Sequence, residues 1–305
     1  MKIFYHPKYN ISLGVFNYLH PFDGCKFSKV YDEIKCLGSI DIVQPSAPID
    51  MAVIESYVGE IFRRLLSNKR YILRALEIPY IPLLPFSVID KRILLPMRWG
   101  VAGTLEAAQD VLQGNMCWNM SGGYHHARRS APEGFCIYND IGIAVQELEK
   151  KNLIKDDTRI LIVDVDAHHG NGNACTFMDD DRVTILDIYN GDIYPQNPHP
   201  KSRININIPL YRGVSGEVYL NKLSEGLSEL KSEYDIAFVV AGTDVISTDP
   251  LGGMHLTVDE CVTRDRMVFD KLKALSIPSV FLGGGGYSSD SATAIAKSIS
   301  ELYRL

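Results

Sequence analysis

The stretch 159–173, RILIVDVDAHHGNGN, constrains this chain more than any other part of its sequence. Four consecutive apolar residues (ILIV) bounded by charge and glycine are typical of a short strand buried on both faces of a parallel sheet. Asp164, Asp166 and His168 follow where such a strand ends, and a side-chain period of two directs both aspartates to the same side. Ligands bind at the carboxyl ends of strands in open α/β sheets. The stretch therefore predicts either a metal site or a strand end capped by hydrogen-bonded side chains.

Short apolar runs that predict strands alternate with stretches of helical periodicity along most of the chain. The predicted strands are 2–5, 40–44, 116–120, 160–163, 183–188, 204–208, 236–240 and 279–282. The predicted helices are 27–36, 51–76, 98–112, 141–150, 218–231 and 258–275, with a loop at 20–24 (HPFDG) before the first of them. This alternation predicts an α/β fold: residues 1–305 form a single three-layer domain, with a mainly parallel sheet of about eight strands and helices on both faces.

The composition, 46% apolar and 22% charged residues, is that of a soluble globular enzyme. A net charge of −6 disfavours direct nucleic-acid binding and mildly favours a basic substrate. Six cysteines without a CxxC pair predict reduced thiols in an intracellular, most simply cytoplasmic, protein. The N-terminus MKIFYHPKYN lacks a secretory signal pattern, and no apolar run is long enough for a membrane span. Nothing in the sequence indicates an oligomeric state.

Other polar clusters also follow predicted strands. The segment 121–140, SGGYHHARRSAPEGFCIYND, carries the adjacent pair His125 and His126; AGTD ends in Asp244, and GGGGY ends in Tyr287. The histidine pair by itself would also suit one exposed and one core histidine. GGGGY lacks the lysine and the spacing of a phosphate-binding loop, so a backbone that places one tyrosine beside a ligand fits better. Because all these clusters fall at strand carboxyl ends, one cleft can collect them.

Asp166, His168 and Asp244 would give a metal ion three protein ligands and one open position, which is typical of catalytic zinc. Ferrous iron or cobalt would satisfy the same ligands. Water held there becomes a nucleophile near neutral pH, and one histidine of the pair 125–126 is placed to act as its base.

Three further side chains complete the predicted site. Asp164 is a candidate acceptor for His125, and Asn171 for His126, because a catalytic histidine usually needs a partner that orients its ring. Tyr287 could donate a hydrogen bond to a carbonyl oxygen that becomes anionic. Together these groups predict metal-assisted hydrolysis of an amide.

The motifs YHHA, GFCIYND, DVDAHHGNG, AGTD, DPLGG and GGGGY, in this order, resemble those of the zinc-dependent histone deacetylases, which have the arginase–deacetylase fold. HPFDGCKFSKV, FMDDDRV and IYNGDIYP look most like the class IV (eleventh-type) members. The resemblance implies zinc at Asp166, His168 and Asp244. It also implies His126 as general base and acid, with His125 as its electrostatic partner.

The same resemblance implies that Tyr287 is the carbonyl donor and that an acyl-lysine stem lies in a narrow channel. The channel residues would be Gly134, Phe135, Tyr194 and Gly285. The resemblance further implies a structural potassium ion, whose binding residues would be Asp164, Asp166, His168 and Asp187.

Some positions depart from the family pattern. Asn171 stands where class I members have aspartate, so His126 should be less basic than in that class. His169 replaces a glutamine typical of class IV members, and GGGGY replaces their SGGY. Asp187 stands about where some relatives use serine near potassium.

The alternatives concern the substrate and the activity. An arginase-like two-metal enzyme would need acids at positions 170 and 246. These positions hold Gly170 and Ile246, so a second metal ion would have no ligands there. An amidohydrolase acting on acetylpolyamines could use the same site as a protein lysine deacylase, and a catalytically inactive binding module would keep only the fold. The class IV resemblance favours long-chain fatty acyl-lysine in a protein or peptide as the substrate.

Overall fold

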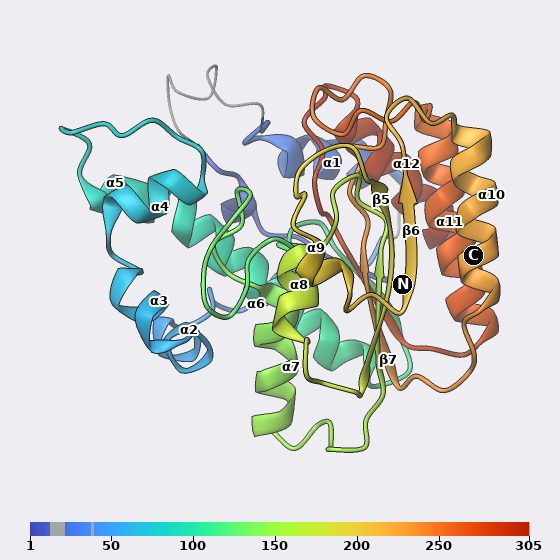
Figure 1. The fold of residues 1–305 in the computed structure, drawn as a ribbon, viewed down its shortest axis with the longest axis horizontal. Helices are drawn as coiled ribbons and strands as arrows, with labels where there is room; N and C mark the ends of the chain where they lie inside the picture. The colour runs from blue at the N-terminus through green and yellow to red at the C-terminus, as the bar shows by residue number, and fades with distance from the viewer. Residues whose placement is uncertain (13–21, 38–39, 305) are drawn as a thin grey trace.

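The computed structural model describes residues 1–12, 22–37 and 40–304 (Figure 1). Within them one sheet of eight strands has the order β2-β1-β3-β8-β7-β4-β5-β6. The strands are β1 Lys2–Phe4, β2 Ile42–Val43, β3 Met116–Asn119, β4 Ile160–Asp164, β5 Val183–Asn190, β6 Ile206–Leu210, β7 Ile236–Val240 and β8 Ser279–Leu282. Every pairing is parallel, which confirms the predicted sheet.

The helices cover both faces of this sheet (Figure 1). They are α1 Lys26–Ile34, α2 Met51–Tyr57, α3 Glu60–Leu65, α4 Lys69–Ala75, α5 Phe86–Ile89, α6 Leu95–Val111, α7 Asp140–Lys150, α8 Asn171–Thr176, α9 Pro198–Lys201, α10 Gly216–Ser228, α11 Val258–Ala274 and α12 Ser291–Tyr303. Helices α1, α10, α11 and α12 pack on one face, and α6 and α7 on the other. Because side chains alternate along a strand, neighbours such as Leu161 and Ile162 enter opposite cores, so the three-layer prediction is confirmed.

The segment 51–76, predicted as one helix, is three helices, and this part of the prediction is wrong. Val58 and Gly59 have extended backbones between α2 and α3, and the extended Asn68 caps α4 by accepting a hydrogen bond from the Tyr71 amide. Such extended and capping residues end one helix and begin another even where the helical spacing of apolar residues continues. The helix predicted from 98 also starts earlier, at Leu95, after a π-helical turn at Asp90–Leu94.

Smaller differences concern the ends of elements. Strand β6 begins at Ile206 rather than 204, and α10 begins at Gly216 because Ser215 caps it. The loop predicted at 20–24 lies partly outside the described residues, since His20 and Pro21 are not among them.

The topology gathers the predicted clusters at one edge of the sheet. The histidine pair follows β3, Tyr287 follows β8, Asp244 follows β7, and Asp166 and His168 follow β4. These four strands are consecutive neighbours in the sheet. Their carboxyl ends therefore meet at the centre of that edge. All six cysteines are free, and no described helix is both long and apolar enough to span a membrane.

Candidate active site

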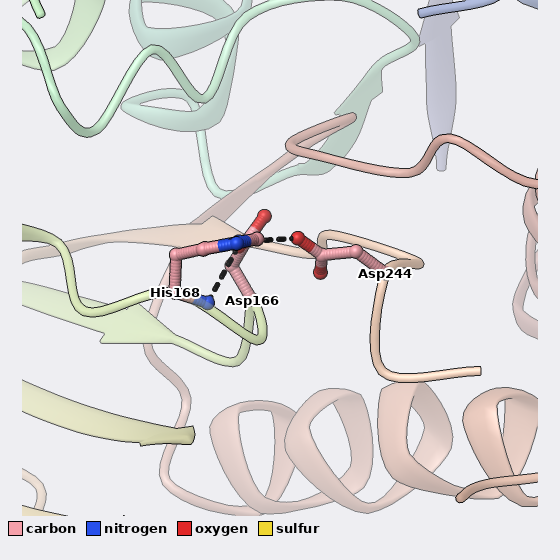
Figure 2. A group of neighbouring side chains, drawn as sticks. All are labelled: Asp166, His168 and Asp244. Carbon is pink, nitrogen blue, oxygen red and sulfur yellow. Dashed lines mark hydrogen bonds and ion pairs between the residues drawn. The ribbon is translucent and has the colours of Figure 1, made fainter. Parts of the chain in front are cut away.

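Asp166, His168 and Asp244 lie together in the structure, as Figure 2 shows. His168 Nδ1 is 2.7 Å from Asp244 Oδ2 and 3.2 Å from Asp166 Oδ1, and one ligand atom from each residue lies within 4.8 Å of the others. Two of these residues follow β4 and the third follows the adjacent β7, and all three are buried. Two carboxylates and an imidazole converging on one point form a donor set that suits zinc and similar divalent ions.

The pKa values of Asp166, His168 and Asp244 depend on one another. Burial alone would lower the pKa of His168, but its hydrogen bonds to Asp166 and Asp244 raise it to about 10. Burial, together with the negative charge of Asp166, raises the pKa of Asp244 to about 7. These pKa values favour a proton shared by the imidazole and the two acids, and a divalent cation at the same place would replace it.

His125 and His126 lie beside this triad with different partners. His125 Nδ1 is 2.8 Å from Asp164 Oδ2, and His126 Nδ1 is 2.7 Å from Asn171 Oδ1, which are the pairs expected from the sequence. The two rings are 4.1 Å apart, and the His126 ring is 5.9 Å from that of His168.

The two histidines differ in pKa and therefore in charge at neutral pH. Burial would lower the pKa of His125, but the carboxylates of Asp164, Asp166 and Asp187 together raise it to about 9. Burial lowers the pKa of His126 well below its usual value, and the positive charges of His125 and His168 lower it further. At neutral pH, His125 is a cation and His126 is a neutral base.

The glycine-rich loop after β8 is hydrogen-bonded to the triad of Asp166, His168 and Asp244. The Gly285 amide donates to Asp166 Oδ2 at 2.8 Å, and a Cβ atom at Gly285 would come within 2.7 Å of the Asp166 and Asp244 carboxylates. Only glycine allows this close approach. The Tyr287 amide donates to Asp249 Oδ2 at 2.7 Å, which fixes the tyrosine backbone.

Tyr287 remains a hydrogen-bond donor at neutral pH. Burial raises the pKa of its hydroxyl well above 10, and the negative charges of Asp244 and Asp166 raise it further. Its ring packs edge-on against Phe135 at 5.8 Å. The aromatic wall on this side of the site is therefore formed by the two residues together.

Two hollows meet at His126 and Tyr287. The outer hollow is also lined by His168, Gly134, Phe135 and Tyr194. The inner hollow is mainly apolar; its lining includes Ile11, Phe22, Phe27, Leu76, Ile78, Ile93 and Met97, besides Gly134 and Phe135. Of the residues predicted for a channel, Gly134, Phe135 and Tyr194 line the outer hollow, whereas Gly285 lines the inner one.

The region predicted to hold potassium contains an unsatisfied carboxylate oxygen. Asp187 Oδ2 is 2.6 Å from His169 Nδ1 and accepts from the Gly170 amide at 3.0 Å, whereas its Oδ1 is buried without a partner among the described residues. Asp164 is its register partner on the neighbouring strand, so both side chains lie on the same face of the sheet. A free buried carboxylate oxygen beside a second acid fits a monovalent cation.

The residues that hold the loops of the site were not among those predicted from the sequence. Arg264 is fully buried on α11 and donates to the Val165 carbonyl at 3.0 Å and to the Gly242 carbonyl at 2.5 Å. Asp265 accepts two hydrogen bonds from this guanidinium and one from Ser298. The sequence does contain one indication of this role, because Asp265 places a charge in the otherwise apolar stripe of its helix.

The comparisons with known proteins agree with this geometry. Residues 73–302 match the histone deacetylase domain family. The chain is 33% identical to histone deacetylase 2 of Arabidopsis thaliana over 100% of its own length and 79% of that protein. The chain therefore belongs to the histone deacetylase family, whose members are amide hydrolases of the deacetylase type.

Solved structures show the same fold at lower identity. A histone deacetylase homologue from Aquifex aeolicus superposes with a TM-score of 0.76 at 22% identity, covering 99% of this chain and 83% of that one. An acetylpolyamine aminohydrolase from Burkholderia pseudomallei gives 0.74 at 21% identity, covering 99% and 98%. Such likeness supports the arginase–deacetylase fold and leaves the substrate open.

Proposed function

We propose that this chain, as a single catalytic domain, hydrolyses the amide bond of acyl-lysine side chains in proteins or peptides. The observation that carries the proposal is that His126 and Tyr287 line both hollows. A lysine stem entering through the outer hollow would bring its amide between these two side chains, beside His168. The acyl chain would then point into the apolar inner hollow.

A divalent cation at Asp166, His168 and Asp244 would supply Lewis acidity, which polarises the carbonyl and makes water nucleophilic near neutral pH. His126 accepts the proton of the attacking water at Nε2, because its Nδ1 is engaged with Asn171. Zinc is the ion that we expect, with iron or cobalt as substitutes.

The other residues stabilise the charge that develops. Tyr287 donates its hydroxyl hydrogen to the carbonyl oxygen as that oxygen becomes anionic, and the His125 cation lies beside the reacting atoms. His126 then returns its proton to the lysine nitrogen while the carbon–nitrogen bond breaks. The products are the lysine ammonium group and the carboxylate of the acyl group, because the second proton of the water leaves the carboxylic acid and ends on the amine.

Long-chain fatty acyl groups are the substrates that we favour. The inner hollow is lined largely by aliphatic and aromatic side chains, and an acetyl group would leave most of that lining without contact. Burying each methylene of a longer chain there would contribute about 0.8 kcal/mol. The class IV resemblance of the sequence points the same way.

We also propose that potassium binds at Asp187 and Asp164, with the backbone of Asp166 and His168. The unpartnered Asp187 Oδ1 supports this assignment, since a buried carboxylate oxygen without a hydrogen-bond partner is unfavourable. The ion would have a structural role beside the metal triad.

The test is hydrolysis by the purified chain of acetyl-lysine peptides, myristoyl-lysine peptides and acetylspermidine, with and without a chelator. We expect the myristoyl peptide to be cleaved with the highest kcat/KM, activity to stop with the chelator, and zinc to restore it. His126→Ala provides the control for contaminating hydrolases.

The alternatives predict different results in the same assay. Faster cleavage of acetylspermidine than of either peptide would identify a polyamine hydrolase. Cleavage of acetyl-lysine as fast as of myristoyl-lysine would remove the fatty-acyl preference. A zinc-loaded protein that hydrolyses none of the three would be a binding module.

A further inference from the structure

The segment Glu60–Leu94, here called the α3–α5 lobe, differs in charge from the rest of the chain. It holds seven basic and three acidic residues, a net charge of +4, in a protein whose net charge is −6. Six of the basic side chains are exposed: Arg63, Arg64, Arg70, Arg74, Lys91 and Arg92. Among the described residues only Arg64 of these six pairs with a carboxylate. In Figure 1 helices α3, α4 and α5 stand to one side of the sheet and its covering helices.

The α3–α5 lobe also exposes large apolar side chains. Leu83 is 93% exposed, Ile61 is 77% exposed and Tyr80 is 47% exposed. The apolar and basic groups are in contact, because Lys69 and Arg70 lie over the Tyr80 ring at 4.8 and 4.9 Å. The apolar loop is therefore bordered directly by positive charge.

The loop 81–85, IPLLP, has most of its backbone polar groups satisfied from within. Lys69 Nζ donates to the carbonyl oxygens of Ile81 and Leu84 at 3.1 and 3.0 Å and to that of Pro82 at 2.8 Å. The prolines have no N–H, and the Leu84 amide donates to the Ile81 carbonyl at 3.3 Å. A loop of this kind can enter an apolar phase without leaving many backbone groups unpaired.

The same segment borders the mouth of the proposed channel. Glu77 lines the outer hollow, and Leu76 and Ile78 line the inner one. The Phe135 amide donates to the Ala75 carbonyl at 3.0 Å, which joins the end of α4 to the channel wall. A surface that binds the α3–α5 lobe would therefore be held close to the channel entrance.

We propose that the α3–α5 lobe docks on an anionic lipid surface, with Leu83 and Tyr80 inserted among the lipids and the exposed arginines and lysine against the head groups. Charge complementarity points to an anionic partner, and the apolar, internally bonded loop points to lipid rather than to nucleic acid. Leu83 offers no hydrogen bond to a base or a phosphate. Insofar as the proposed fatty-acyl activity holds, docking would present the channel to acyl-lysines whose chains lie in the membrane.

Vesicle binding by the full chain tests this docking surface without any need for turnover. The probes are vesicles of phosphatidylcholine alone and of about three parts phosphatidylcholine to one part phosphatidylserine, at low and high salt. We expect co-sedimentation only with the phosphatidylserine vesicles, and release of the protein as salt increases.

Two variants assign the binding to the α3–α5 lobe. Leu83→Glu removes the apolar tip, and Arg70→Glu with Arg74→Glu reverses two charges one helical turn apart on α4. Each should weaken vesicle binding by about tenfold or more. The matched controls are Leu153→Glu, at another exposed leucine, and Lys155→Glu with Lys231→Glu, the same charge change elsewhere. Both controls should bind as the unaltered chain does.

The results separate this proposal from its rivals and from the proposed activity. Absence of binding to phosphatidylserine vesicles, or equal loss in the control variants, would overturn docking. Docking on lipid would also be overturned if the protein bound no vesicles but bound a DNA duplex, or associated with itself, and Leu83→Glu abolished that binding. Vesicle binding by a protein that cleaves no acyl-lysine would leave docking intact and refute the proposed function alone.

Discussion

His125 and His126 are adjacent in the chain, yet the fold makes the first a cation and leaves the second neutral. Both rings are buried, but the Nδ1 atom of His125 meets a carboxylate of β4, whereas that of His126 meets a neutral amide of α8. The positive charges of His125 and His168 lower the pKa of His126 further. A carboxylate stabilises an imidazolium, and an amide does so far less. His126 therefore stays neutral as the base of the proposed reaction, and its partner Asn171 adds no negative charge that would offset burial.

Replacing Asn171 should shift the pH dependence of kcat/KM. The depressed pKa of His126 keeps it neutral well below pH 6.5, so the acidic limb of kcat/KM should lie below that value. Asn171→Asp would stabilise the His126 imidazolium and raise its pKa, so the base form would be lost at higher pH. We expect the acidic limb to move upward.

The measurement is a pH–rate profile of each variant. Asn221→Asp, the same change at an exposed position on α10, is the control and should leave the limb in place. An unshifted limb in Asn171→Asp would mean that His126 is not the base.

Tyr287→Phe should fold normally but lose roughly 10²–10³ in kcat, because one hydrogen-bond donor to the anionic oxygen is removed. Steady-state kinetics and circular dichroism together check this expectation. Tyr211→Phe, at an exposed tyrosine, should have no effect. Near-full activity of Tyr287→Phe would assign the oxyanion donor to another group.

At the scale of elements, α11 joins the two loops that carry the proposed metal ligands Asp166, His168 and Asp244. Arg264 Nη1 bonds the carbonyl before Asp166 and the carbonyl two residues before Asp244, while Asp265 neutralises its charge. The sequence could have indicated this role only through the charge on an otherwise apolar helix face.

Arg264→Met would leave Asp265 as an uncompensated buried charge and free both carbonyls. We expect unfolding free energy to fall by about 3–5 kcal/mol and zinc affinity to fall with it. Urea unfolding and zinc titration measure the two effects. Arg266→Met, at a half-exposed arginine on the same helix that pairs with Glu301, should cost no more than about 1 kcal/mol.

Helix and strand positions were largely predictable because each depends on local periodicity. Buried strands such as β4 and β8 were found from their apolar runs, and α7 from its spacing. The break of 51–76 into three helices was not found, since it depends on extended residues at 58–59 and 68 whose conformations the tertiary packing selects. The lobe built from these helices was therefore also hidden.

For the molecule as a whole, bound cations should add to stability. Asp166, His168 and Asp244 are buried acids and a base that a divalent ion would unite, and Asp187 Oδ1 lacks a partner among the described residues. A ligand that binds only the folded state raises the free energy of unfolding in proportion to the logarithm of its concentration. Thermal unfolding should therefore respond to zinc and to potassium separately.

We expect the unfolding midpoint to fall with a chelator, and to be higher in potassium chloride than in tetramethylammonium chloride of equal ionic strength. Asp187→Asn should shrink the potassium effect and leave the zinc effect. Asp156→Asn, at an exposed aspartate, is the control. A potassium effect of the same size in Asp187→Asn would exclude this carboxylate as a ligand.

The sequence by itself determined the parallel α/β architecture, the family and the chemical types of the site residues. Those properties depend on short-range periodicity and on which side chains follow each strand. Only the tertiary structure decided that His168 meets Asp244, that His125 and His126 differ in charge, that two hollows share one wall, and that a basic, apolar lobe borders both hollows. Each of these depends on contacts between residues far apart in the chain, which local sequence patterns do not encode.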